Sequence, residues 1–192
     1  MVIVKSVTYF EEPGGANTDV TLKAALKRAE ELGIKDVVVA STRGGTGVKA
    51  VEVFRGYNVV VVTHSAGFRE PGVLEFPEEA RQRIVDGGGK VLTTGHAFAG
   101  VSRAVRRKFD TLGPAELVAY VLRMFGQGMK VAVECSCMAA DAGMIPMDGD
   151  VISIGGSGSG ADTAVVLKPA HLHNLFDCYI KEVIAKPSVP RD

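Results

Sequence analysis

Two apolar runs, at residues 36–40 and 59–62, constrain the fold of this chain more than any other feature. Neither run alternates apolar with polar residues, as a strand with one face in water would do. Consecutive valines bounded by turn signals are instead typical of strands that are covered on both faces. We therefore expect a mostly parallel sheet with a layer of helices on each side.

The segments around these runs alternate between strand-like and helix-like patterns along the whole chain. Further strands are expected at 3–9, 90–93, 129–134, 150–154 and 163–167. Helices are expected at 18–32, 46–54, 77–86, 101–109, 114–125 and 171–184, with a frayed tail at 186–190. This order predicts an α/β three-layer sandwich, formed by a single domain over residues 1–192, with an antiparallel hairpin near the C-terminus.

Composition excludes several kinds of partner. The 22 basic and 22 acidic residues give a formal net charge of zero, and the basic cluster at 103–108 has no interleaved aromatic residues, so nucleic acid is not expected. No apolar stretch reaches the roughly 18 residues of a membrane span. The three cysteines do not suggest a disulfide framework and favour a cytoplasmic protein.

Loops rich in glycine and hydroxyl groups follow five of the expected strands. In a doubly wound sheet, ligands bind beyond the carboxyl ends of the strands, so these loops are the candidate binding site. The candidate ligand-binding residues are Gly14, Gly15, Asn17, Thr18, Ser41, Thr42, Arg43, Gly44, Gly45, Thr46, Gly47, Thr63, His64, Ser65, His96, Gly156, Ser157, Gly158, Ser159 and Gly160.

The 41–47 loop carries the strongest signal for an anion. A buried strand leads into it, and an amphipathic segment begins directly after it. Such a turn can direct several backbone N–H groups, hydroxyls and a helix start at one phosphate, with Arg43 supplying positive charge. The loop matches neither the Walker pattern nor Gly-x-Gly-x-x-Gly, so it predicts a phosphate without predicting a reaction.

Two histidines are the candidate proton-transfer groups. His64 and His96 each follow an expected strand and so belong to the ligand edge of the sheet. They can act as a general acid or base, or as polar ligand contacts. The pattern leaves both roles open.

Other reactive residues predict no separate chemistry. The Gly-x-Ser-x-Gly pattern at 156–160 precedes a strand instead of forming a strand-to-helix elbow, which disfavours a serine hydrolase. Cys135 and Cys137 lack zinc-knuckle spacing and are expected to be core or site-edge thiols. No third ligand accompanies His171 and His173, so no metal site is expected.

Segments 36–47 and 59–64 resemble the C-terminal domain of pyruvate kinases. That family has an apolar strand, a Thr/Ser-x-Ser-Gly-x-Thr/Ser turn, a helix and a second strand ending in Thr, and Ser41, Gly44 and Thr46 occupy matching positions. Residues 158–166 resemble the closing loop and last strand of the family. In pyruvate kinases these two loops form an allosteric sugar-phosphate site, so the resemblance implies a phosphate pocket shared by 41–47 and 156–160.

The resemblance also limits the function. No catalytic barrel is present, so pyruvate kinase activity is not expected, and Arg43 places a positive charge two positions from its place in the family. Stand-alone archaeal-type members of the family look like FMN binders, which makes FMN the favoured cofactor, with Phe68, Phe98 and Tyr9 as aromatic candidates for stacking. Two alternatives stay open: an enzyme using a flavin or sugar phosphate with His64 or His96 as acid or base, and a non-catalytic regulatory module that forms a homo-oligomer through the 171–184 helix.

Overall fold

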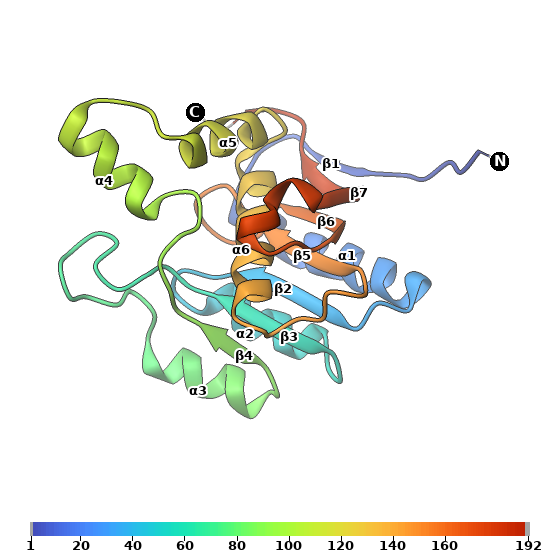
Figure 1. Cartoon of the computed structure of the whole chain (residues 1–192). Coiled ribbons are helices and arrows are strands. Elements are labelled where there is room, and N and C mark those ends of the chain that lie inside the picture. Colours follow the sequence, from blue (N-terminus) through green and yellow to red (C-terminus); the bar gives the residue numbers. More distant parts are fainter. Residues whose placement is uncertain (1, 191–192) are drawn as a thin grey trace.

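The computed structural model describes residues 2–190, which form one seven-stranded sheet between two layers of helices (Figure 1). The strand order is β1-β7-β6-β5-β2-β3-β4. The strands are β1 (Thr8–Phe10), β2 (Asp36–Ala40), β3 (Asn58–Val62), β4 (Lys90–Leu92), β5 (Val151–Gly155), β6 (Thr163–Lys168) and β7 (Tyr179–Pro187). Only β6 runs against the others, because it pairs antiparallel with β5 and β7 while the remaining pairs are parallel. The three-layer α/β sandwich with an antiparallel β5–β6 hairpin is therefore confirmed.

The valine runs are buried on both faces, as their composition predicts. Val37 and Val39 of β2 pack into one core cluster, and Val38 packs into a second cluster on the opposite face. All three side chains are fully buried. Burial of each such side chain contributes about 1.5–3 kcal/mol, so the two-sided burial of β2 and β3 holds the three layers together.

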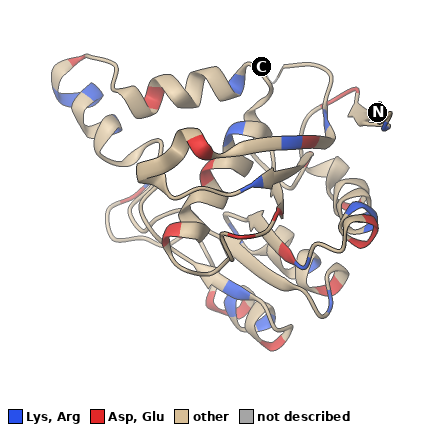
Figure 2. Cartoon of the chain, turned by 45° about the vertical axis from the view of Figure 1, so that its right-hand side comes forward, with Lys and Arg blue, Asp and Glu red and all other residues tan. Residues whose placement is uncertain are grey.

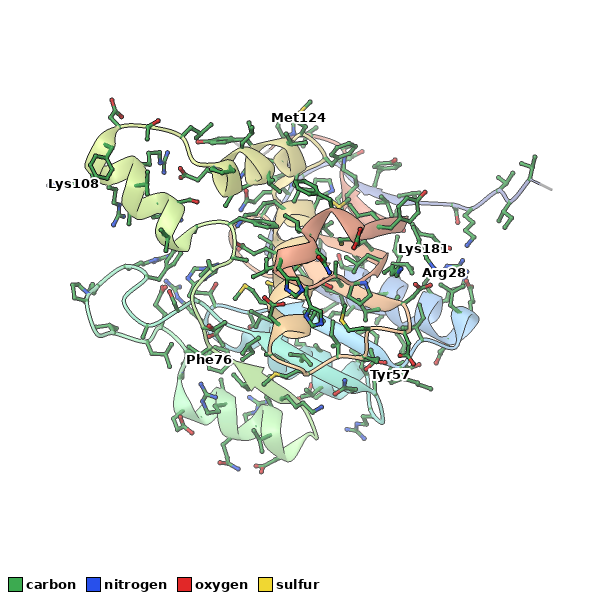
Figure 3. The ribbon with its side chains drawn as sticks, viewed as in Figure 1. Arg28, Tyr57, Phe76, Lys108, Met124 and Lys181 are labelled. Carbon is green, nitrogen blue, oxygen red and sulfur yellow. The ribbon has the colours of Figure 1, made fainter. Side chains whose placement is uncertain are left out.

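The helices divide between the two faces of the sheet. The first face is covered by α1 (Thr18–Leu32), α2 (Gly45–Val53) and α3 (Glu78–Asp86), and the second by α5 (Pro114–Arg123) and α6 (Gln127–Asp141). Helix α4 (Gly100–Phe109) has no buried residue and projects from the body beside α5 (Figure 1). Figure 3 labels Lys108 and Met124 at the C-terminal ends of α4 and α5. Within residues 2–190, no helix combines the length and apolarity needed to span a membrane.

The expected strand at 129–134 is wrong, because these residues lie inside α6. This helix packs directly on β5 and β2, and nearly all of its residues from Gly128 to Ala140 are buried. A helix buried on most sides has no continuous polar face, so its sequence loses the 3.6-residue period that distinguishes helix from strand.

The expected helix at 171–184 is also wrong. A 3-10 segment, η2 (Leu172–Asp177), is followed by β7, which pairs antiparallel with β6 and parallel with β1. The apolar residues do repeat at helical spacing, but 179–184 is also rich in strand-forming residues, and pairing on both edges decides the outcome.

Both ends of the described chain differ from expectation. Only Thr8 and Tyr9 of the expected 3–9 strand pair with the sheet, as part of β1, and Ile3 and Val4 are 72% and 89% exposed. The expected frayed tail at 186–190 is partly ordered, because β7 continues through Pro187 and the Ser188 N–H donates to the Phe10 carbonyl at 2.8 Å.

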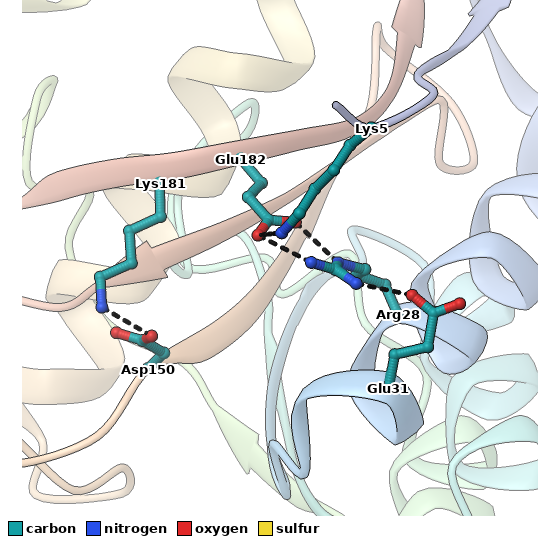
Figure 4. A network of polar contacts seen from close by, with 6 residues as sticks. All are labelled: Lys5, Arg28, Glu31, Asp150, Lys181 and Glu182. Carbon is teal, nitrogen blue, oxygen red and sulfur yellow. Dashed lines mark hydrogen bonds and ion pairs between the residues drawn. The ribbon is translucent and has the colours of Figure 1, made fainter. Parts of the chain in front are cut away.

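A polar network joins α1, β7 and the N-terminal segment (Figure 4). The Arg28 Nε donates to Glu182 Oε2 at 2.7 Å, Lys5 also pairs with Glu182, and Glu31 accepts from Arg28 at 2.6 Å. The hydrogen bond from Arg28 lowers the pKa of Glu182 to about 2, against the opposing effect of partial burial.

Candidate functional site

A cavity of about 510 Å³ lies at the carboxyl ends of β2, β3 and β5, bounded on its other side by residues of α4, α5 and α6. Twelve of the residues selected from sequence line it. They are Ser41, Thr42, Arg43, Gly45, Thr46, Thr63, His64, His96, Gly156, Gly158, Ser159 and Gly160. Loops that are far apart in sequence therefore meet in one place because the parallel strands end at one edge of the sheet.

The 41–47 loop presents the start of α2 to this cavity. Gly44 adopts a left-handed conformation at φ 85°, and a Cβ there would collide with Ala80 of α3, so only glycine fits. Ser41 Oγ accepts the Gly47 N–H at 3.2 Å, which closes the loop. The N–H groups of Gly45 and Thr46 belong to the first turn of α2 and have no intrahelical acceptor, so they are free for a ligand.

The 156–160 turn lies across the cavity and is held from behind by Asp162. This buried carboxylate accepts hydrogen bonds from the N–H groups of Gly14 (2.8 Å) and Ser157 (3.1 Å). Thr18 Oγ1 accepts the Ala161 N–H at 3.0 Å and donates to the Gly15 carbonyl. Asp162 has no place among the sequence-selected residues, although it fixes the position of the turn.

Eight selected residues do not line the cavity. Gly14, Gly15 and Thr18 support the 156–160 turn, and Asn17 donates to the Glu12 carbonyl at 2.7 Å. Gly44 and Gly47 shape the start of α2, Ser157 is bonded to Asp162, and Ser65 accepts the Phe68 N–H in the loop after β3. Their expected ligand contacts stay a prediction.

His64 is held by two polar contacts and one aromatic contact. Its Nδ1 lies 3.0 Å from Glu75 Oε2, its Nε2 lies 3.2 Å from Thr42 Oγ1, and Phe68 stacks on the ring at a centroid distance of 3.9 Å. Burial lowers the pKa of His64 despite the opposing hydrogen bond to Glu75. The imidazole is therefore neutral near pH 7 and able to accept a proton.

His96 faces a second carboxylate on α6. Its Nδ1 lies 3.5 Å from Oε2 of Glu134, an oxygen that also pairs with Lys130. The other oxygen, Oε1, accepts the Phe98 N–H at 2.7 Å. Burial alone raises the pKa of Glu134, but His96 and Lys130 outweigh it and bring the pKa to about 2. The rings of His64 and His96 lie 5.2 Å apart. The two histidines therefore share one wall of the cavity, each with its own carboxylate.

The cavity is positively charged. Five cationic side chains line it, and among the lining residues that the structure describes Glu134 is the one carboxylate, already paired with Lys130. The cations are Arg43, Arg69, Arg103, Arg123 and Lys130. The ribbon in Figure 2, coloured by charge, shows basic and acidic positions dispersed among one another over the body of the molecule. A cavity whose unpaired charges are all positive favours an anionic ligand.

Sequence reasoning missed most of these cations. Lys130 and Glu134 are four residues apart, the spacing of an ion pair on a helix, but a strand was predicted there. Arg103 and Arg123 reach the cavity only through the placement of α4 and α5, which no local pattern reveals.

Some of the aromatic and thiol candidates line the cavity in the structure, and others do not. Phe68 lines the cavity, whereas Phe98 is buried beside it and Tyr9 is 59% exposed on β1. Cys135 borders the cavity, and burial raises the pKa of its thiol, which keeps it protonated. Among residues 2–190, no three His, Cys, Asp or Glu side chains gather as a metal site would require.

The fold and the cavity define an α/β domain with a cationic site at the carboxyl edge of its sheet. Comparison with protein families gives the same class: the family described as "Pyruvate kinase, alpha/beta domain" matches residues 19–167. The chain belongs to this family.

Proposed function

We propose that this protein binds a phosphorylated small molecule in the cavity, with the phosphate at the 41–47 loop and with FMN as the favoured ligand. One observation carries the proposal: the open start of α2 lies inside a cavity lined by cations. An anion placed there meets free N–H groups, the positive end of the helix dipole and Arg43 at the same time.

The phosphate contacts follow from the loop. The Gly45 and Thr46 N–H groups and the Thr46 hydroxyl donate to phosphate oxygens, and Arg43 supplies an ionic contact. Ser41 Oγ already accepts from Gly47, which leaves its hydrogen to donate. Hydrogen bonds to a charged group are worth about 1.5–3 kcal/mol each, so these contacts account for most of the binding energy of a small phosphate ester.

The remainder of the cavity suits a planar group. Its volume lies within the roughly 300–1,000 Å³ of small-molecule sites. The rings of Phe68, His64 and His96 lie within 5.2 Å of one another and form an aromatic wall. A flavin ring can stack on such a wall. This wall, and the resemblance to FMN-binding members of the family, support FMN over a sugar phosphate.

Gly45 offers the sharpest test of the phosphate position. No atom lies within 4 Å of a Cβ built there, and the residue is the first of α2, so Gly45→Asp is compatible with folding. An aspartate in the first helical turn even complements the helix dipole, but it repels a phosphate at the same place. Gly44 is unsuitable because its substitution collides with Ala80.

We expect Gly45→Asp to weaken FMN binding by about 100-fold or more, which is roughly 2.7 kcal/mol. Gly45→Ala, the matched control, should bind within about threefold of the unmodified protein, since it adds a methyl group without charge. Isothermal titration calorimetry gives both affinities. Equal affinity of the two variants for FMN would contradict the assignment of the phosphate to the 41–47 loop.

An enzyme is the second candidate, because each cavity histidine is paired with a carboxylate. The visible spectrum of the FMN-loaded protein before and after NAD(P)H separates the candidates, since only an enzyme bleaches the flavin band with turnover. The helix at 171–184, through which the regulatory module was expected to form its subunit contacts, is not formed, and the module itself stays an untested alternative. A homo-oligomer stays a prediction, which light scattering would test.

A further inference from the structure

We propose that the Thr42 hydroxyl is a phosphoryl acceptor, activated by His64 and oriented by Glu75, so that the cavity takes a phosphate ester or acyl phosphate as substrate. This inference rests on the phosphate-binding part of the proposed function and not on the flavin.

The three side chains form a hydroxyl–imidazole–carboxylate relay. Thr42 Oγ1 lies 3.2 Å from Nε2 of His64, and the opposite ring nitrogen lies 3.0 Å from Glu75 Oε2. A nucleophile beside a base that is oriented by a third group is the arrangement of activated hydroxyls in general. Thr42 and His64 line the cavity whereas Glu75 stands behind them, as these roles require.

The chemistry of Glu75 fixes the tautomer of His64. The hydrogen bond from His64 lowers the pKa of Glu75, so the carboxylate is ionised and can only accept hydrogen bonds. The hydrogen of the neutral imidazole must therefore sit on Nδ1. This leaves Nε2 with its lone pair toward Thr42, and the threonine hydroxyl donates to it.

Two further contacts hold the relay in place. Arg69 Nε lies 3.2 Å from the other oxygen of Glu75, and Phe68 stacks on the His64 ring. Glu75 is thus fixed on both oxygens and the ring cannot turn away from Thr42. A purely structural role, which fastens the loop after β3, requires only the His64–Glu75 pair. It does not require that Nε2 of His64 face a hydroxyl group in the cavity.

The position of Thr42 selects phosphorus as the atom attacked. Thr42 belongs to the same loop as the proposed phosphate cradle and directly precedes Arg43. The free N–H groups at the start of α2 and the cations Arg43 and Arg103 can stabilise the charge on the transferring phosphoryl oxygens.

The step balances without a further reactant. A bond forms between Thr42 Oγ1 and phosphorus while the bond from phosphorus to the leaving oxygen breaks. The Thr42 proton passes to His64 Nε2, which then protonates the leaving alcohol or carboxylate. Water, deprotonated by His64, later attacks the phosphothreonine and releases inorganic phosphate, and Thr42 regains its proton from the imidazolium.

Acetyl phosphate and p-nitrophenyl phosphate are the probes for this step. After incubation with acetyl phosphate, intact-mass analysis and peptide mapping should locate an acid-stable phosphoryl group on Thr42. Thr42→Ser, which keeps the hydroxyl, should carry the group on the serine. Thr42→Val, which has the same shape without the hydroxyl, should remain unlabelled. His64→Gln should reduce the rate of p-nitrophenol release by about 100-fold or more.

A pH profile tests the positioning role of Glu75. The hydrogen bond that His64 donates to Glu75 raises the pKa of His64 against the effect of burial, so Glu75→Gln should move the rising limb of the release rate to lower pH. A residue that served only stability would change the rate without moving the limb.

Calorimetric titration with inorganic phosphate separates the two proposals. Phosphate binding without any label on Thr42 overturns this inference and leaves the proposed function standing. An acid-labile label that persists in Thr42→Val is phosphohistidine and also overturns it. Absence of phosphate binding overturns both.

Discussion

At the scale of single residues, the Lys130–Glu134 ion pair is the feature of the site that least tolerates the loss of one partner. Both side chains are at least nine-tenths buried, and Glu134 is ionised. Removing one partner leaves a buried charge without compensation, which costs about 3–5 kcal/mol. We expect Lys130→Met to lose about that much unfolding free energy, measured by urea denaturation.

The double variant Lys130→Met/Glu134→Gln is the control. It removes both charges, and the glutamine oxygen can still accept the Phe98 N–H, so most of the stability should return. If the single variant unfolded at the same urea concentration as the unmodified protein, the pair would not be a buried ionic interaction.

The sequence predicted the residues whose role is local. The 41–47 loop was found because its glycines and hydroxyls follow a valine strand directly. Arg123 could not be found in this way, because it enters the cavity from a separate helix. Asp162 lies directly after the 156–160 turn and accepts the Ser157 N–H within it, but its hydrogen bond from the distant Gly14 has no local signal. These long-range contributions depend on the tertiary arrangement.

At the scale of elements, the Arg28–Glu182 pair fastens α1 to β7 (Figure 4). The folded-state pKa of Glu182 is about 2, below its ordinary value of 4.5. The pair therefore contributes stability above about pH 4.5, and this contribution is lost as the pH falls from about 4.5 toward 2. We expect Glu182→Gln to be less stable than the unmodified protein at neutral pH, with the difference closing across that window in urea titrations.

Glu31→Gln is the matched control for this effect. Glu31 also accepts from Arg28, but it is more exposed than Glu182, so its loss should change stability little at any pH. A difference between Glu182→Gln and the unmodified protein that stayed constant down to pH 2 would contradict the account.

The elements that sequence predicted correctly are those with one unambiguous local signal, which is an uninterrupted valine run for β2 and a 3.6-residue period for α1. The strand β2 and the helix α1, which ends at Gly33 in a left-handed conformation, have the expected bounds. The two elements that were predicted wrongly, α6 and β7, are those in which tertiary packing overrides the local pattern. Burial on most sides removed the polar face of α6, and pairing with β1 and β6 overrode the helical spacing of β7.

At the scale of the whole molecule, the cavity joins both helical layers to the sheet edge. A ligand in it contacts the loops after β2, β3 and β5 and the helices on the second face, so binding should stabilise the fold as a unit. At a concentration of 100 times its Kd, FMN should add about 2.7 kcal/mol and raise the Tm by roughly 5–10 °C.

Riboflavin, which has the same ring without the phosphate, is the matched ligand for this experiment. It should give a clearly smaller shift at equal concentration, and Gly45→Asp should lose most of the FMN shift. Equal shifts with FMN and riboflavin would mean that the phosphate contributes nothing.

Native mass spectrometry of protein purified without added ligand tests the central claim most directly. We predict a bound small molecule in the unmodified protein and in Gly45→Ala whose mass and fragments include a phosphate group, and its absence in Gly45→Asp. A bound molecule without phosphate, or equal retention of a phosphorylated one by Gly45→Asp, would contradict the assignment of the 41–47 loop as the phosphate site.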